Sequence, residues 1–197
     1  FGDIVGRPGR QALKEILPKW REKYQPDLIV GNGENLAHGK GITRKTLEEV
    51  LEIGLDLVTS GNHLWQKKEV FALLEDPDIP LIRPANWPSG VPGQGWRILS
   101  VRTKKILVIN LMGRVFMHQQ IDDPFRCLDE ILEKLEEPVN GIIIDWHAEA
   151  TSEKQALGWY ADGRVSAVLG THTHIPTADA RILPKGTAYI SDVGMVG

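Results

Sequence analysis

The sequence predicts an α/β layered fold with a mixed sheet, and three observations support this class. Short apolar runs of strand type alternate with helical patterns through residues 10–74, as in βαβ units. Two strand-like runs within residues 96–111 surround Arg102-Thr103-Lys104, which favours an inserted antiparallel hairpin. After residue 141, strand and helix patterns alternate again and end in two short strand-like runs.

The first half of the chain is predicted to contain three helices and two strands. Residues 10–24 carry apolar side chains on one helical face and include Pro18, which is expected to bend the helix. Thr43 is a suitable N-cap for a helix that runs through Ile53 and ends at Gly54. The other predicted elements are strands over residues 27–30 and 55–59 and a helix over residues 66–74.

The second half starts with a proline-rich loop and is richer in predicted strands. Pro124 begins a helix that is expected to reach Glu137, because proline is favoured in the first helical turn. A further helix is predicted over residues 152–160. The predicted strands cover residues 96–101, 105–111, 141–145, 165–169, 180–183 and 187–190.

Composition excludes several classes of protein. The 197 residues suit one domain, residues 1–197, and 42% hydrophobic residues with a net charge of −3 argue against disorder. No apolar run approaches the roughly 20 residues of a membrane-spanning helix. The single cysteine, Cys127, excludes an internal disulfide and a thiolate-rich metal site, and it favours the cytoplasm. The balance of 23 basic and 26 acidic residues predicts no stable nucleic-acid partner.

Five polar clusters follow predicted strands. They are Gly2-Asp3, Gly33-Glu34-Asn35, Gly61-Asn62-His63, Asp145-Trp146-His147 and Gly170-Thr171-His172-Thr173-His174. Since open α/β sheets bind ligands at the carboxyl ends of their strands, we expect these clusters to share one crevice. The first cluster lacks most of its strand and the last apolar stretch ends the chain, so truncation at both ends is expected.

Each cluster taken alone also has a structural explanation. The alternatives are a turn for Asp3, a capping loop for Glu34-Asn35, a hydrogen-bonded turn for Asn62-His63 and a buried structural histidine for His147. His172 and His174 point more directly to a metal, because residues two apart in extended backbone face the same side.

Together the clusters form a donor set for transition metals. Two carboxylates, an amide oxygen and three imidazoles suit Fe, Mn, Co or Zn, and six donors suit two ions that share a carboxylate. Two ions about 3.5–4 Å apart lower the pKa of a bridging water and hold phosphate oxygens for in-line attack. His63, beside Asn62, would be placed to protonate the leaving oxygen.

The order of these motifs resembles the calcineurin-like metallophosphoesterase superfamily. The chain is most similar to its bacterial YmdB-type branch, a group of 2′,3′-cyclic-nucleotide phosphodiesterases. The stretches that carry this resemblance are Gly2-Asp-Ile-Val-Gly-Arg-Pro-Gly9, Asn32-Gly-Glu-Asn35, Ser60-Gly-Asn-His63, Arg83-Pro-Ala-Asn86, His147-Ala-Glu-Ala-Thr-Ser-Glu-Lys154 and Gly170-Thr-His-Thr-His174. Val5 and Glu34 stand where the broader superfamily usually has histidine and aspartate, and both agree with this branch.

The resemblance implies an α/β/β/α sandwich and a role for each matching residue. Asp3, Glu34 and His174, with Asn35 as an additional ligand, would hold one divalent ion, and Glu34, Asn62, His147 and His172 the other. Iron or manganese is expected, with zinc or cobalt as alternatives. His63 would be the general acid, and Arg7 and Arg114 would contact a small nucleotide substrate unless they are ordinary surface residues. A further C-terminal segment is also implied.

Two other functions compete with this hypothesis. His-x-His after a strand is also found in metal-dependent amidohydrolases, but there it normally lies on the first strand of a (βα)₈ barrel of roughly 250 residues. A regulatory module could bind a nucleotide or metal without turnover. With either function, the chain could form homo-oligomers. Hydrolysis of a chromogenic phosphodiester with Mn²⁺ would distinguish an enzyme from such a module.

Overall fold

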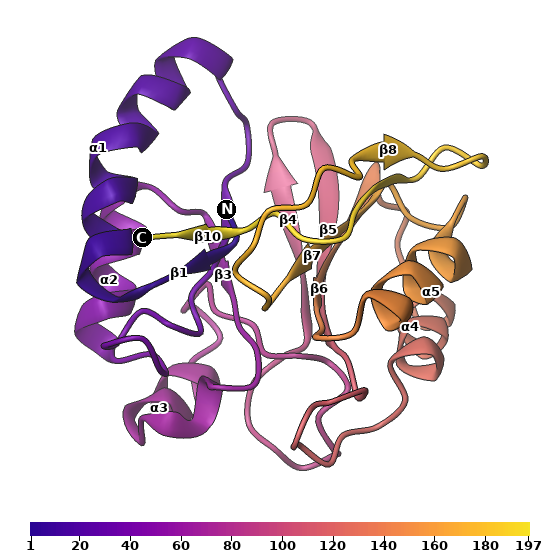
Figure 1. Cartoon of the computed structure of the whole chain (residues 1–197), viewed down its shortest axis with the longest axis horizontal. Helices are drawn as coiled ribbons and strands as arrows, with labels where there is room; N and C mark the ends of the chain where they lie inside the picture. Colours follow the sequence, from indigo (N-terminus) through magenta and orange to yellow (C-terminus); the bar gives the residue numbers. More distant parts are fainter.

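The computed structural model describes residues 1–197 and arranges them in four layers, α/β/β/α (Figure 1). On one outer side lie α1 (Gly6–Tyr24), α2 (Arg44–Ile53) and α3 (Glu69–Glu75), and on the other lie α4 (Pro124–Glu133) and α5 (Thr151–Ala161). The strands occupy the two inner layers. The predicted α/β class and its layering are therefore confirmed. None of the helices is both long enough and apolar enough to cross a membrane.

The first inner layer consists of short parallel strands. β1 (Asp3–Ile4) pairs with β10 (Met195–Val196), and β2 (Val30–Asn32) pairs with β3 (Leu57–Thr59). Phe1 joins the two pairs, since its amino group donates to the Val30 carbonyl at 2.8 Å and its carbonyl accepts from the Asn32 amide at 3.1 Å. Both chain termini lie at this layer, beside α1 (Figure 1).

The second inner layer is a six-stranded mixed sheet with the order β4-β5-β6-β7-β9-β8. Its strands are β4 (Trp96–Val101), β5 (Lys104–Met112), β6 (Gly141–His147), β7 (Ala167–Thr171), β8 (Arg181–Ile182) and β9 (Ala188–Ile190). The four central strands are parallel, and β4 and β8 are antiparallel edges. The predicted hairpin is present as β4–β5, but it is no insertion, because β5 pairs along its length with β6. Layers of this kind rule out the barrel of the amidohydrolase alternative.

Alternating side chains on the strands create a separate core between each pair of layers. Val58 of β3 packs with α1 to α3, whereas its neighbour Leu57 packs against Val108 of β5 in a small cluster between the sheets. Ile144 and Trp146 of β6 face the core beneath α4 and α5. Since successive side chains of a strand alternate, Asp145 and His147 face the opposite side, between the sheets.

Local departures from the predicted boundaries have identifiable causes. α1 starts four residues earlier than expected, at Gly6, whose φ of 55° suits glycine. It continues through Pro18 to Tyr24. α4 ends at Glu133, short of the predicted Glu137, which is disfavoured in a helix because it precedes a proline.

The remaining elements agree in type and differ in extent. The predicted helix over residues 66–74 is divided into the short 3₁₀ turn η1 (Leu64–Gln66) and α3. The first predicted strand is displaced, because the Ile29 amide donates to the Asp56 carboxylate at 2.7 Å and ladder pairing begins only at Val30. The six predicted strands of the second half and the helix over residues 152–160 are all present. β4 has the predicted ends, and the other elements differ at one or both ends.

Candidate metal centre

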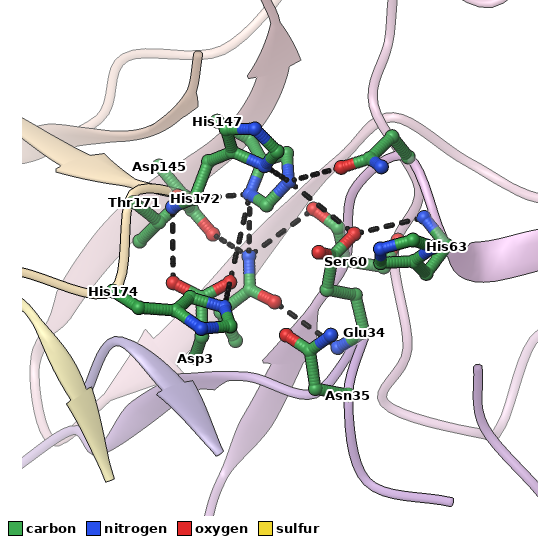
Figure 2. A network of polar contacts seen from close by, with 12 residues as sticks. Asp3, Glu34, Asn35, Ser60, His63, Asp145, His147, Thr171, His172 and His174 are labelled. Carbon is green, nitrogen blue, oxygen red and sulfur yellow. Dashed lines mark hydrogen bonds and ion pairs between the residues drawn. The ribbon is translucent and has the colours of Figure 1, made fainter. Parts of the chain in front are cut away.

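The polar clusters predicted from the sequence meet at the carboxyl ends of five parallel strands. Figure 2 shows side chains from all of these segments pointing toward one another. Asp3 lies in β1, Glu34 and Asn35 follow β2, Asn62 and His63 follow β3, His147 ends β6, and His172 and His174 follow β7. Three of these strands belong to the first inner layer and two belong to the six-stranded sheet, so the site spans the junction of the two layers.

Three donor atoms gather around the imidazole of His147, which is fully buried. Its Nε2 lies 2.9 Å from Asn62 Oδ1, 3.1 Å from His172 Nδ1 and 3.3 Å from Glu34 Oε2. Ligand atoms that each bind the same cation at about 2.0–2.2 Å lie as far from one another as these donor atoms do. Glu34, His147 and His172 therefore fit a single cation, with the Asn62 amide oxygen as a fourth donor.

Glycine at position 61 keeps this space open. A Cβ on Gly61 would overlap both His147 Nε2 and Glu34 Oε2. The backbone of the loop after β3 thus approaches the donor atoms closely, which places Asn62 beside them. The Gly-Asn-His pattern in the sequence reflects this close approach.

A buried hydrogen-bond network beneath the site orients the His147 ring. Asp145 accepts hydrogen bonds from the hydroxyls of Thr59 and Thr171 and, at 3.0 Å, from Asn32 Nδ2. Because the Thr171 hydroxyl donates to Asp145, its oxygen can accept from His147 Nδ1–H, which lies 3.0 Å away. This tautomer leaves the Nε2 lone pair directed at the other donors, as a metal ligand requires.

A second group of donors surrounds Asp3, which is fully buried. Asp3 Oδ2 accepts from the His172 amide at 3.0 Å, but Oδ1 has no hydrogen-bond partner and lies 3.7 Å from His174 Nε2. Asn35 donates its Nδ2 to the Gly39 carbonyl at 2.8 Å, so its unpartnered Oδ1 is free to accept. Buried oxygen atoms without partners are costly, and a cation would satisfy both.

The electrostatics of the centre favour a positive charge. Burial raises the pKa of Asp3, but contact with His174 and the nearby His147 outweigh it and lower this pKa to about 2. Burial lowers the pKa of His147, but Glu34 and Asp3 raise it to about 9. Both shifts show that the carboxylates attract a proton to the imidazoles. A cation would replace that proton, since only neutral imidazole binds metal.

The backbone of the His172-Thr173-His174 segment differs from the prediction. The sequence suggested extended backbone, but φ is 96° at His172 and 65° at His174, in the left-handed region that non-glycine residues rarely adopt. The histidines therefore reach the site from a tight turn. The buried Asp192 carboxylate holds this turn by accepting from the Thr173 amide at 3.1 Å. A tertiary contact of this kind has no signal in the local sequence.

The three residues predicted to handle substrate differ in how far the structure supports that role. The His63 amide donates to Glu34 Oε2 at 2.9 Å, while its half-buried imidazole makes no hydrogen bond with the protein. Arg114 is exposed and its guanidinium lies 3.8 Å from the Asp123 carboxylate. Arg7 is exposed in the first turn of α1 and makes no side-chain hydrogen bond or ion pair.

Several residues at the site were not among the predicted ligands. Glu149 Oε2 lies 2.7 Å from His172 Nε2, so this carboxylate orients the ring from the side opposite Nδ1. Asp145 could have been found from the strand period, because it stands two residues before His147 on the same face. Asn32 also supports the centre, since its Oδ1 accepts from the Glu34 amide at 3.0 Å.

The four layers, with donor residues at the strand ends, define a metallophosphoesterase-type fold. The chain belongs to the YmdB-like protein family, whose model matches residues 1–197. It is 54% identical to the 2′,3′-cyclic-nucleotide 2′-phosphodiesterase of Bacillus subtilis over 198 aligned residues, covering 100% of this chain and 74% of the relative.

Solved structures agree with this membership. A hypothetical protein from Thermus thermophilus superposes with a TM-score of 0.92 at 52% identity, covering 98% of this chain and 74% of that one. A phosphatase from Mycoplasma pneumoniae superposes with a TM-score of 0.91 at 40% identity, covering 98% of this chain and 70% of that one. The family resemblance predicted from the sequence is confirmed.

Proposed function

We propose that this chain is a metal-dependent phosphodiesterase that converts 2′,3′-cyclic nucleotides to 3′-nucleotides. The observation that carries the proposal is the group of buried carboxylate, amide and imidazole donors at the strand ends. Cations bound by this group would provide the positive charge that attracts a phosphate. The net charge of the chain, −3, provides no such attraction. The substrate class is supported by the Bacillus subtilis relative, which is a 2′,3′-cyclic-nucleotide 2′-phosphodiesterase.

The donor set fits two divalent cations that share Glu34. Asn62, His147 and His172 would complete one site. The donor atoms of Asn62, His172 and Glu34 all lie within 3.3 Å of His147 Nε2. Asp3, Asn35 and His174 would complete the other, where two buried oxygens lack partners. The mixture of nitrogen and oxygen donors suits iron or manganese, with zinc and cobalt as alternatives.

The reaction would be an in-line displacement at phosphorus. When bound, the cations would lower the pKa of a water and bind the phosphate oxygens. Water would attack phosphorus and release a proton to solvent, the bond from phosphorus to O2′ would break, and the departing O2′ would take a proton from the His63 imidazole. The phosphate then remains on O3′. The His63 imidazole suits this role because neither of its ring nitrogens is hydrogen-bonded to another protein group; among the His63 nitrogens only the backbone amide is, to Glu34.

Product analysis tests the substrate assignment. The chain supplied with Mn²⁺ should hydrolyse 2′,3′-cyclic AMP to 3′-AMP, separated from 2′-AMP by chromatography. Formation of 2′-AMP, or cleavage of phosphomonoesters alone, would contradict the proposal. Cation binding with no hydrolysis of cyclic nucleotides or a chromogenic diester would instead favour a regulatory module.

A pair of adjacent substitutions tests the separate roles of Asn62 and His63. His63→Ala should retain its metal and lose about 10²–10⁴-fold in rate on cyclic nucleotides, the range for general acid catalysis. On bis(p-nitrophenyl) phosphate the loss should be much smaller, because nitrophenolate needs little protonation. Asn62→Ala should lose metal and activity on both substrates. Equal losses for His63→Ala on both substrates, with metal retained, would show that His63 is not the acid.

A further inference from the structure

The loop between β5 and α4 borders the candidate metal centre. At its start, the Gly113 amide donates to the His147 carbonyl at 2.9 Å. Further along, Gln119 Nε2 donates to the Asn62 carbonyl at 3.4 Å. Since His147 Nε2 and Asn62 Oδ1 are themselves 2.9 Å apart, both anchors lie beside the same donors. Residues 113–119 therefore form one wall of the site.

A buried carboxylate on α5 fixes the first part of this wall. Glu153 is buried, and its two oxygens accept from the amides of Arg114, at 2.9 and 3.1 Å, and Val115, at 3.2 Å. Gly113 allows this approach, because a Cβ there would overlap Glu153 Oε2. The loop is thus bound to α5 as well as to the metal centre.

Phe116, at the turn of this loop, is held in a conformation that exposes its ring. The residue is 81% exposed, the highest value among the large hydrophobic side chains, and its φ of 63° is unfavourable for a bulky residue. Other exposed aromatic residues such as Trp20 and Phe71 pack against a neighbouring ring, but Phe116 stacks on no ring and no cation. Strain and exposure together indicate a site for a ligand.

We propose that Phe116 is a specificity residue that stacks on the nucleobase of the substrate. This inference rests on the proposed function, in which the metal ligands and His63 act on the phosphate. Phe116 stands three positions after Gly113, which borders the centre, so the Cα atoms of these two residues lie within about 10–11 Å of each other. Every nucleobase presents a flat π-face, and stacking on an aromatic ring binds such a face with little dependence on sequence.

Substrates with and without a base test this role. For Phe116→Ala, we expect KM for 2′,3′-cyclic AMP to rise about 5- to 100-fold, the effect of losing one base stack. The value of kcat should change little, because stacking does not touch the reacting atoms. KM for methyl β-ribofuranoside 2,3-cyclic phosphate, which has no base, should be unchanged. Phe116→Trp should restore the wild-type KM for cyclic AMP, whereas Phe116→Leu should not.

Tyr24→Ala is a matched control, since Tyr24 is an exposed aromatic residue on α1, and it should behave as wild type on both substrates. An unchanged KM of Phe116→Ala for cyclic AMP, or an equal increase for the base-free ester, would overturn the inference while the proposed function stands. Wild-type protein that hydrolyses neither ester would refute the proposed function and the inference with it.

Discussion

Replacing the buried Lys154 should destabilise the protein through the turn that carries two candidate ligands. Lys154 Nζ donates to the Thr171 carbonyl at 2.6 Å and lies 3.1 Å from Asp192 Oδ2. The side chains of Lys154 and Asp192 are only 2% and 1% exposed. Burial lowers the pKa of Lys154, and the charge of Asp192 opposes this effect. Lys154 and Asp192 therefore form a buried ion pair at the base of the turn.

Lys154→Met keeps the volume of the side chain and removes its charge. The Asp192 carboxylate is then left buried without a cation, which costs about 3–5 kcal/mol for a pair of this kind. In a domain of this size each kcal/mol lowers Tm by about 2–4 °C, so the expected decrease is about 6–20 °C. The double variant Lys154→Met/Asp192→Asn should recover part of this loss, because no uncompensated charge remains.

Thermal unfolding followed by circular dichroism in the presence of a chelator measures this effect without a contribution from bound metal. Elemental analysis of protein purified without chelator should show reduced metal in Lys154→Met, since the turn with His172 and His174 loses its support. A decrease in Tm below about 2 °C would refute the reasoning. A double variant less stable than Lys154→Met would also show that the buried charge is not the cause.

Two further predictions concern other parts of the chain. We expect about two cations per chain by elemental analysis. Glu34→Ala should lose both of them, whereas Asp3→Ala should lose one. A single ion that remains bound in Glu34→Ala would contradict a carboxylate shared by the two cations. Burial and the nearby Glu130 raise the pKa of Cys127 to about 11, so its alkylation by iodoacetamide at pH 8 should be about a hundredfold slower than that of an unperturbed thiol and should accelerate as the pH approaches 11. A rate equal to that of a free thiol at pH 8 would contradict this.

Predictions from the sequence succeeded where local chemistry determines the structure. α2 has the predicted bounds because its ends are fixed by nearby residues: the Thr43 side chain accepts from the Thr46 amide, and Gly54 adopts a φ of 121°. The clustering of polar segments at one edge also followed from the sequence. It required only that the strands be parallel, not that their order be known.

Predictions failed where distant residues determine the local conformation. The backbone at His172 depends on Asp3, whose carboxylate accepts the His172 amide from 169 positions away in the chain. The contact of Glu149 with His172 likewise arises only when β6 and β7 lie side by side. Such contacts are products of the tertiary fold and leave no periodic pattern in the sequence.

The donor residues of the centre come from both inner layers, so the centre lies across the junction of the two sheets. The apolar cluster between the sheets has only three fully buried members, Leu57, Ile82 and Val108. Glu34 and Asn62 approach from one layer and His147 and His172 from the other, so a cation bound by them would join the two sheets at the carboxyl ends of their strands. The free energy of cation binding would therefore also stabilise the contact between the two sheets. This stabilisation would grow with metal concentration as RT ln(1 + [metal]/Kd). The supply of metal would then determine how stably the two sheets are held together.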